Sequence, residues 1–366
     1  MTGATIPAAT TDITVDWLNE RLADSDDVGT ITGLEREPMG LGVGILGEIA
    51  RLYLTYADGE SGPATMIAKC QSAFEENIGL CQMMGFYVRE VSFYQQLADS
   101  ISIRVPRPFV ADMEPGGAPF ILVMEEVTGA EMIDQIDGAN LDEAKRVLDA
   151  VAALHARFWD NDDLYALEWL PPMNNDMYKG AQVLGEANWP EFEANWGPKV
   201  PERTLRAVQA FTPIYPQALD FLYDFGTPTF AHTDCRAENY LFGGSAGADA
   251  TTMLDFQLST RHMGTFDLAN FLGMSITIEN RRAWQDELME HYHGALMTGG
   301  VPASYTLDQC RTEYRYNLMQ QAWAQLAIAN VDPGNDRGRE LLNAFVTRSF
   351  QAAEDNESYE LLDQIG

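Results

Sequence analysis

The stretch that decides the fold reads His232-Thr233-Asp234-Cys235-Arg236-Ala237-Glu238-Asn239, and Asp255-Phe256-Gln257 follows sixteen positions after Asn239. Residues 240–254 have the composition of a short apolar strand, a glycine-rich turn and a returning strand, which predicts a hairpin. The hairpin brings Asp255 back beside a loop that already holds Asp234 and Asn239. Phosphoryl transfer needs one carboxylate to orient and deprotonate an attacking hydroxyl, and an Asn and an Asp to hold Mg²⁺ on a triphosphate. A surface loop with ordinary acidic residues is the other interpretation, but spacing, hairpin and the trailing Asp-Phe-Gln together favour a magnesium-nucleotide site.

A glycine-rich segment lies upstream, where Gly42, Gly44 and Gly47 form a G-x-G-x-x-G run. Dinucleotide-binding turns share this pattern, but they must open a helix, whereas residues 49–56 are β-rich and lead to the turn pair Asp58-Gly59. The run therefore predicts a strand–loop–strand hairpin that lays backbone amides over the phosphates of ATP, because glycine has no Cβ to block close approach. A plain glycine-rich hairpin without a ligand stays open as the alternative.

Lys69 ends an apolar strand in a chain that has only four lysines. A lysine at such a position often reaches solvent, but Lys69 also falls where a phosphate-binding lysine belongs. The helical segment 86–97 carries Glu90 four residues from apolar positions on either side, which places its carboxylate on the inward face of the helix. An inward carboxylate needs a cation, so Glu90 is the predicted partner of Lys69, with Glu75 and Glu76 as alternatives.

With these motifs in view, the chain resembles the protein-kinase-like small-molecule phosphotransferases, the superfamily of the aminoglycoside phosphotransferases and choline kinases. Its Asp-Phe-Gln triplet is most similar to the ecdysteroid-kinase-like (CHK) branch, and the likeness covers about residues 35–275. The resemblance implies an α+β, two-lobed protein-kinase-like fold. A small lobe with a five-stranded antiparallel sheet would lie over a larger, mainly helical lobe, with ATP and Mg²⁺ in the cleft.

The resemblance also implies roles for individual residues. Asp234 would be the catalytic base, and Asn239 and Asp255 would be the metal ligands. Lys69 would contact the α- and β-phosphates, with Glu90 holding it in place.

Other positions match or depart from the family's pattern. Asp267 resembles the buried aspartate that braces the catalytic loop, and His232 resembles a histidine that supports the turn without doing chemistry. Thr233 stands where the superfamily usually has glycine, so a slightly different loop backbone is expected. Gln257 replaces the glycine of protein kinases, and no arginine precedes Asp234. Without that arginine or an A-P-E segment, neither control by activation-loop phosphorylation nor a protein substrate is expected.

Composition agrees with a globular enzyme that acts on small molecules. The chain has 366 residues, 46% of them hydrophobic, and a formal net charge of −32, so nucleic acid is not an expected partner because phosphate contacts need Lys and Arg. No apolar run is long enough for a membrane span, and the N-terminal residues lack the pattern of a signal peptide. The four cysteines form no C-x-x-C pair, which favours reduced thiols and a cytoplasmic location. No protein partner is evident from the sequence.

The sequence divides into two expected domains. Residues 1–124 would form the N-terminal nucleotide-binding lobe, and residues 125–366 the C-terminal catalytic and substrate-binding lobe. The boundary follows a buried strand over 120–124, so the backbone near Glu125 is the predicted hinge that hydrogen-bonds adenine. Amphipathic patterns predict helices over 14–22, 86–97, 141–158, 281–297, 314–328 and 340–352.

Two features of the larger domain bear on the substrate. His155 is interpreted as a packed helix histidine rather than a base. The segment 159–216 breaks the helical pattern and is rich in aromatic residues, which predicts that it recognises an apolar acceptor; simple packing of these rings is the alternative.

The predicted function is therefore an ATP·Mg²⁺-dependent kinase that phosphorylates a hydroxyl of a small, substantially apolar molecule. A cationic acceptor of the aminoglycoside or choline type is the first alternative, since carboxylates at Asp160, Asp162, Asp163 and Glu168 could bind it. The acidic charge itself fits either a cleft for such a substrate or a strongly solvated surface. A non-catalytic pseudokinase and an oxidoreductase built on the glycine-rich run are the remaining alternatives.

Overall fold

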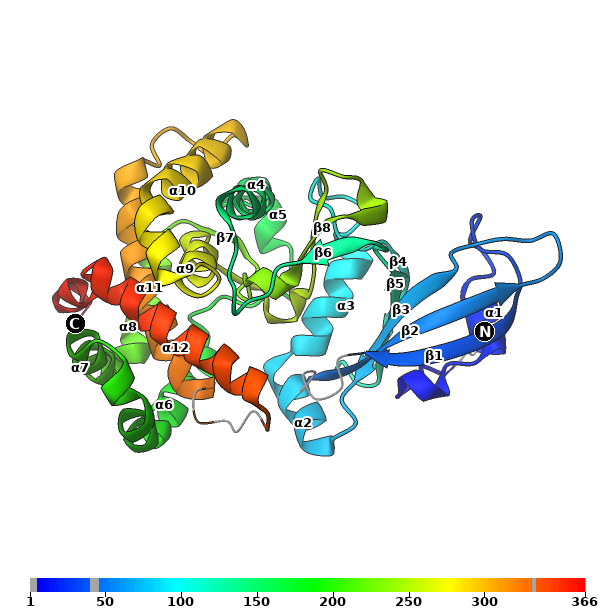
Figure 1. The fold of residues 1–366 in the computed structure, drawn as a ribbon, viewed down its shortest axis with the longest axis horizontal. Helices are drawn as coiled ribbons and strands as arrows, with labels where there is room; N and C mark the ends of the chain where they lie inside the picture. The colour runs from blue at the N-terminus through cyan, green and yellow to red at the C-terminus, as the bar shows by residue number, and fades with distance from the viewer. Residues whose placement is uncertain (1–4, 40–45, 329, 331–333, 366) are drawn as a thin grey trace. The chain divides into compact units, whose positions relative to one another are not determined.

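The computed structural model describes residues 5–39, 46–328, 330 and 334–365, and Figure 1 shows its ribbon. By internal contacts the chain divides into two compact units. Unit 1 consists of Met1–Ala130 and Gly243–Leu258, and unit 2 consists of Glu131–Phe242 and Ser259–Gly366. Gly42 and Gly44 of the glycine-rich run lie outside the described residues. The functional division into lobes at residue 124 stays a prediction.

A five-stranded sheet forms the centre of unit 1, in the order β1-β2-β3-β5-β4, and each neighbouring pair is antiparallel. The strands are β1 (Ile31–Met39), β2 (Gly47–Tyr56), β3 (Thr65–Gln71), β4 (Pro108–Met113) and β5 (Phe120–Glu125). Gly59 takes a φ of 81° in the turn between β2 and β3, as a glycine can and most residues cannot. Lys69 lies on the central strand β3, opposite Ile49 of β2 and Leu122 of β5. The sequence predicts this antiparallel sheet, and the structure has it.

Three helices accompany the sheet: α1 (Val15–Arg21), α2 (Glu75–Met84) and α3 (Phe86–Gln96). Thr14 is the N-cap of α1, as predicted, because its Oγ1 accepts a hydrogen bond of 3.1 Å from the backbone N–H of Trp17. Helix α3 packs against β4 and β5, and it also packs against η6 (Phe256–Leu258), the short 3₁₀ helix at the end of the segment 243–258. This packing brings the Asp-Phe-Gln triplet to the helix that carries Glu90.

Unit 2 is mainly helical. Its helices are α4 (Leu141–Arg157), α5 (Asp162–Tyr165), α6 (Asp176–Trp196), α7 (Glu202–Phe211), α8 (Tyr215–Phe225), α9 (Thr265–Met274), α10 (Ile278–Thr298), α11 (Leu307–Ile328) and α12 (Asp336–Asp355). Helix α9 is buried along its whole length and packs against α11 and α12, while α4 packs against α10 (Figure 1). The helix predicted over 141–158 is confirmed, and α10, α11 and α12 contain the three helical segments predicted beyond residue 280.

The remaining strands of the described residues are short. They are β6 (Ala130–Met132), β7 (Pro228–Ala231), β8 (Tyr240–Gly243), β9 (Thr251–Met253) and β10 (Thr260–Met263). Strands β7 and β10 form an antiparallel pair, and residues 232–239 lie between them in the sequence. The predicted hairpin after Asn239 is present, and its turn is closed by the N–H of Gly243, which donates to the carbonyl of Ala250 at 2.9 Å.

The segment 159–216 differs from the expectation of broken structure, because α5, α6 and α7 all lie within it. Asn175 caps α6, and its Oδ1 accepts from the N–H of Tyr178 at 3.0 Å. Pro190 lies inside α6, where it removes one backbone donor without ending the helix. Buried rings such as Phe192, which stacks on Phe350 of α12 with centroids 5.4 Å apart, hold α6 in place.

Over the described part of the chain, every helix is either too short or too polar to cross a lipid bilayer.

Candidate active site

A buried lysine and two carboxylates meet in unit 1. Lys69 Nζ lies 2.8 Å from Glu90 Oε1 and 3.4 Å from Asp255 Oδ1. Lys69 is 7% exposed and Glu90 is 2% exposed. Burial by itself lowers the pKa of Lys69, but the charges of Asp255 and Glu90 outweigh it and raise the pKa. Burial raises the pKa of the Glu90 carboxyl against the opposing charge of Lys69.

The packing of α3 on η6 fixes this cluster. Phe256 stacks on Phe93 of α3 with ring centroids 3.4 Å apart, and it meets Tyr94 edge to face. Asp255 has a positive φ of 62°, which an aspartate tolerates better than most residues, and Gln257 Nε2 donates to its Oδ2 at 3.3 Å. The rings therefore anchor the Asp-Phe-Gln triplet while Asp255 turns toward Lys69.

Three other residues of unit 1 are candidates from the sequence: Gly47, Glu75 and Glu76. Gly47 begins β2, where an added Cβ would lie 2.8 Å from the carbonyl oxygen of Cys70, so strand packing already requires a glycine there. Glu75 and Glu76, the alternatives to Glu90, lie exposed in the first turn of α2.

Glu125, the predicted hinge residue, is engaged on both its side chain and its N–H. Arg104 Nη2 donates to both carboxylate oxygens of Glu125, at 2.6 and 2.5 Å. The backbone N–H of Glu125 donates to the carbonyl of Arg107 at 2.9 Å. A backbone contact between this segment and adenine stays a prediction, and it would need the carbonyl of Glu125 or a later peptide group.

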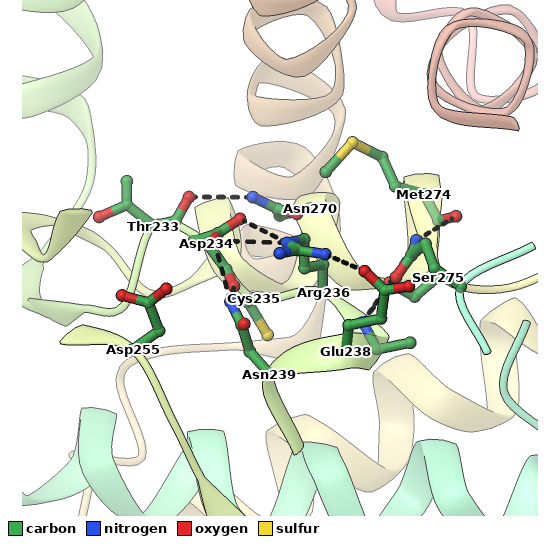
Figure 2. Close-up of polar contacts among 12 residues, drawn as sticks. Thr233, Asp234, Cys235, Arg236, Glu238, Asn239, Asp255, Asn270, Met274 and Ser275 are labelled. Atoms are coloured by element: carbon green, nitrogen blue, oxygen red, sulfur yellow. Dashed lines mark hydrogen bonds and ion pairs between the residues drawn. The ribbon is translucent and has the colours of Figure 1, made fainter. Parts of the chain in front are cut away.

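In unit 2 residues 232–239 form a compact loop between β7 and β8, drawn in Figure 2. Asn239 Nδ2 donates to the carbonyl oxygen of Asp234 at 2.7 Å and to its Oδ2 at 2.9 Å. Arg236 Nε lies 3.4 Å from the same carboxylate (Figure 2). The side chain of Cys235 points the other way, to the hydroxyl of Tyr240 at 3.0 Å, and burial raises the pKa of its thiol. The loop thus presents Asp234 with its direction fixed by two neighbours.

The buried carboxylate of Asp267 accepts hydrogen bonds from two backbone N–H groups at the start of this loop. Asp267 Oδ2 accepts from the N–H of His232 at 2.6 Å, and Asp267 Oδ1 accepts from the N–H of Thr233 at 2.7 Å. His155 Nε2 lies 3.0 Å from the same carboxylate, and its Nδ1 lies 2.8 Å from the hydroxyl of Tyr292. The predictions that Asp267 braces the loop and that His155 is a packed helix histidine are both confirmed by this geometry. The sequence did not show that the two residues are partners.

Thr233 corrects the expectation of a different loop backbone. Its φ is 68°, the left-handed conformation that glycine adopts freely and that a β-branched residue adopts only under constraint. Besides the bond to Asp267, the carbonyl of Thr233 accepts from Asn270 Nδ2 at 3.0 Å (Figure 2). The loop therefore keeps the backbone that glycine would take, and hydrogen bonds on both sides of Thr233 hold it there.

Sequence reasoning missed the groups that support the far end of the loop. The N–H of Ala237 donates to Gln135 Oε1 at 2.8 Å and to Ser275 Oγ at 2.9 Å. Glu238 is bound by Arg236 and lies 3.4 Å from Arg337 of α12. These partners are separated from the loop by about a hundred residues or less, and spacing along the sequence carries no signal for such pairs.

The residues proposed for the metal can be tested against its chemistry. Among the described residues, no group of three or more His, Cys, Asp or Glu side chains could hold a metal ion. The predicted donor set is different, a carboxamide and a carboxylate that act together with phosphate oxygens. Asn239 uses its amide nitrogen for both bonds to Asp234, which leaves the amide oxygen as a ligand atom, and the side chain of Asp255 is 26% exposed. Oxygen donors of these two kinds fit Mg²⁺.

Solved structures with this fold include kinases of small molecules. Choline kinase from Cryptosporidium parvum Iowa II superposes with a TM-score of 0.58 over 97% of both chains, at 10% identity. Ethanolamine kinase from Plasmodium vivax gives a TM-score of 0.51 over 87% of this chain and 84% of that one, at 12% identity. The GDP complex of wild-type aminoglycoside 2'-phosphotransferase-IIIa gives 0.50 over 90% and 96%, at 13% identity. The chain therefore has the kinase-like fold of small-molecule phosphotransferases, and the predicted fold class is confirmed.

Sequence comparison places the chain in a family. Residues 89–332 match the family DUF1679, described as "Uncharacterized oxidoreductase dhs-27", and the chain belongs to that family, which is ecdysteroid-kinase-like. A curated relative, the uncharacterized kinase-like protein D1044.1 of Caenorhabditis elegans, is 23% identical over 233 residues. That match spans 62% of this chain and 61% of the relative, so the chain matches about three fifths of the relative's length.

Proposed function

We propose that this protein is an ATP- and Mg²⁺-dependent kinase that transfers the γ-phosphoryl group to a hydroxyl of a small, substantially apolar molecule. The observation that carries the proposal is the cluster of Lys69, Glu90 and Asp255 in unit 1. These residues come from β3, from α3 and from the segment after β9, so no local structure brings them together. A lysine held by a helix carboxylate and facing the Asp of such a triplet suits the phosphates and metal of a nucleotide.

In this proposal Asp234 orients the acceptor hydroxyl and takes its proton. Asn239 donates to one oxygen of Asp234 and Arg236 lies beside the carboxylate, so the base keeps one direction. The bond between the acceptor oxygen and the γ-phosphorus forms as the bond from that phosphorus to the bridging oxygen of ADP breaks. Lys69 would bind the α- and β-phosphates, and its two carboxylate neighbours keep it charged at neutral pH. When bound through Asn239 and Asp255, Mg²⁺ supplies positive charge that offsets the charge of the phosphates.

The proposal of an apolar acceptor rests on the aromatic composition of the segment 159–216, not on its packing. Several of its rings pack among helices: Trp159 lies edge-on to Tyr305, with ring centroids 4.7 Å apart, and Tyr215 stacks on Trp323 at 3.5 Å. Tyr165, by contrast, is exposed. A cationic acceptor remains the second candidate, because Asp160, Asp162 and Asp163 are partly or fully exposed in the same segment.

The other two candidates have less support. An oxidoreductase, the word in the family's description, would need a helix after the glycine-rich run, but β2 begins at Gly47. A pseudokinase would be expected to lack part of the set formed by Lys69, Asp234, Asn239 and Asp255, all of which are present.

The experiment is a screen for acceptor-dependent release of ADP over alcohols, sterols and aminoglycosides, with wild-type protein and the Asp234→Asn variant. A general base is worth about 10²–10⁴-fold, so the variant should lose that much turnover while its thermal stability and its affinity for ATP stay the same. An Asp234→Asn protein that keeps half of the wild-type turnover would remove Asp234 from the mechanism. A best acceptor that is a polycationic sugar, bound less tightly as salt increases, would replace the apolar acceptor with the cationic one.

A further inference from the structure

Unit 2 contains a cavity of about 740 Å³ between the C-terminal end of α6 and residues 339–348 of α12. Its size lies within the range of small-molecule sites, about 300–1,000 Å³. The residues that define it are Trp196, Lys199, Ile278, Arg339, Leu342 and Arg348. Asp234 and Asn239 are not among the residues that line the cavity, so it is separate from the proposed phosphoryl-transfer residues.

The charge of this cavity is opposite to that of the protein. The whole chain has 55 Asp and Glu against 23 Lys and Arg. Among the described residues that line the cavity, Lys199, Arg339 and Arg348 are cations and Glu340 is the one carboxylate. A concentration of positive charge on one concave surface of an acidic protein favours an anionic ligand there.

Arg348 is the most informative of these residues, because it is only 9% exposed and no carboxylate among the described residues lies within ion-pair distance of it, although the charge of Asp137 acts on it from farther away. Its guanidinium is held by backbone carbonyls instead. Nη1 donates to Gln135 at 2.8 Å and to Met274 at 3.0 Å, and Nη2 donates to Ile136. These bonds use three of its five N–H groups, which leaves Nε–H and one Nη2–H for another acceptor. A buried cation normally has an anion close by.

Trp196 and Lys199 line the cavity at the C-terminal end of α6. The ammonium of Lys199 lies 4.2 Å from the centroid of the Trp196 ring, which keeps the cation at the cavity. The apolar faces of Trp196, Ile278 and Leu342 give the cavity a hydrophobic part beside its cations. The lining therefore matches a ligand that has both an apolar body and an anionic head.

We infer that this cavity is a binding site for a small organic carboxylate with an apolar or aromatic body. The carboxylate would accept from the remaining N–H groups of Arg348, because a guanidinium matches the planar geometry of a carboxylate, and Lys199 and Arg339 would supply further positive charge. The body would lie against Trp196 and its aliphatic neighbours. This site does not depend on the proposed kinase activity, and its test uses no nucleotide.

The test is isothermal titration calorimetry with three probes that share one aromatic body: phenylpropionate, phenylpropanol and phenylpropylamine. Phenylpropionate should bind, and it should bind at least about tenfold more tightly than the neutral and cationic probes, because only it can pair with the guanidinium and ammonium groups. A Lys199→Gln/Arg339→Gln variant should weaken phenylpropionate binding by about tenfold, since both side chains are exposed and can be changed without disturbing the core. Arg348→Lys keeps the positive charge but removes the planar guanidinium group, so it should also weaken phenylpropionate binding.

The matched control is Arg107→Gln/Arg157→Gln, which removes the same charge from two exposed positions, one in unit 1 and one at the C-terminal end of α4, neither of which contributes a residue to the cavity. This control should bind phenylpropionate as the wild type does. The inference is overturned if phenylpropionate does not bind, if all three probes bind equally, or if the control variant loses as much affinity as the cavity variant.

Discussion

Lys69 has two carboxylate neighbours, and this decides how substitutions around it should combine. Lys69→Ala should lower turnover strongly, because it removes the charge that would bind the phosphates. Glu90→Gln alone should cost less, since Asp255 still lies 3.4 Å from the ammonium. Adding Glu90→Gln to Lys69→Ala should cost little more than Lys69→Ala alone, with a coupling of about 0.5–3 kcal/mol between the two sites.

The measurement is kcat and the KM for ATP of the two single variants and the double variant. Glu75→Gln is the control, because Glu75 is an exposed glutamate in the neighbouring helix α2 and should behave as wild type. Strict additivity of the two substitutions, or an equal loss in Glu75→Gln, would show that Lys69 and Glu90 do not act as a pair.

Glu313 predicts a pH dependence of stability. It is 1% exposed, accepts hydrogen bonds from Tyr305 at 2.8 Å and Gln309 at 3.1 Å, and has no cationic partner among the described residues. Burial raises its pKa from 4.5 to about 7. The folded protein therefore keeps this proton to higher pH than the unfolded chain does. The stability that this group contributes is fully present below pH 4.5 and is lost as the pH rises through about 7.

Glu313→Gln should remove that loss, because an amide does not ionise; its single oxygen can replace only one of the two acceptors, but the cost of the lost bond is the same at both pH values. The free energy of unfolding of the variant relative to wild type should increase by on the order of 3 kcal/mol between pH 4.5 and pH 7.5, measured by urea denaturation at both values. The difference between the two proteins isolates Glu313 from Glu90, whose carboxyl is also raised in pKa by burial. A difference that is the same at both pH values would contradict this account.

Single residues with strong chemical requirements could be predicted from the sequence, and their supporting partners could not. The helical period of residues 86–97 predicts Glu90 on the inward face of its helix, and its carboxylate is buried beside Lys69. By contrast, Gln135 and Ser275 hold the N–H of Ala237 through contacts that join distant parts of the chain. Amides and hydroxyls occur throughout any sequence, so nothing in their spacing identifies the few that support a loop.

At the scale of elements, the N-cap of α6 gives a direct prediction. Asn175→Ala removes the side-chain acceptor of the Tyr178 N–H, and it should destabilise unit 2 by about 1 kcal/mol. Asn175→Asp should retain most of the stability, because a carboxylate accepts the same bond and is favoured at a helix N-terminus. The check is the midpoint of thermal denaturation of the three proteins. Equal midpoints for Asn175→Ala and wild type would show that the cap contributes nothing.

Helices with an amphipathic period could be predicted, whereas α6 could not. The helix over 141–157 has apolar residues on one face and a capping box at Asn140 and Glu143, and both signals are local. Helix α6 contains two glycines and Pro190, which weaken its local helical preference, and only Gly185, Phe192 and Trp196 of its 21 residues are buried. Its stability comes from tertiary contacts such as Phe192 with Phe350, which override the weak local preference.

At the scale of the whole molecule, the class of fold could be predicted because the motifs resemble those of a known superfamily. That resemblance implies an antiparallel five-stranded sheet and a larger, mainly helical part, and the structure has both. Unit 1 also includes Gly243–Leu258, which a linear division of the sequence at residue 124 does not contain. This segment joins unit 1 because Phe256 packs on α3, a long-range contact that composition does not reveal.

The central claim is that this protein binds a magnesium nucleotide, and a thermal-shift comparison of Mg·ATP, Mg·GTP and NADH tests it most directly. A ligand that binds only the folded protein, present at a hundred times its Kd, adds about 2.7 kcal/mol of stability. Mg·ATP should raise the denaturation midpoint of the wild type, Lys69→Ala should abolish most of that increase, and NADH should cause none. A midpoint raised by NADH but not by Mg·ATP or Mg·GTP would contradict the account.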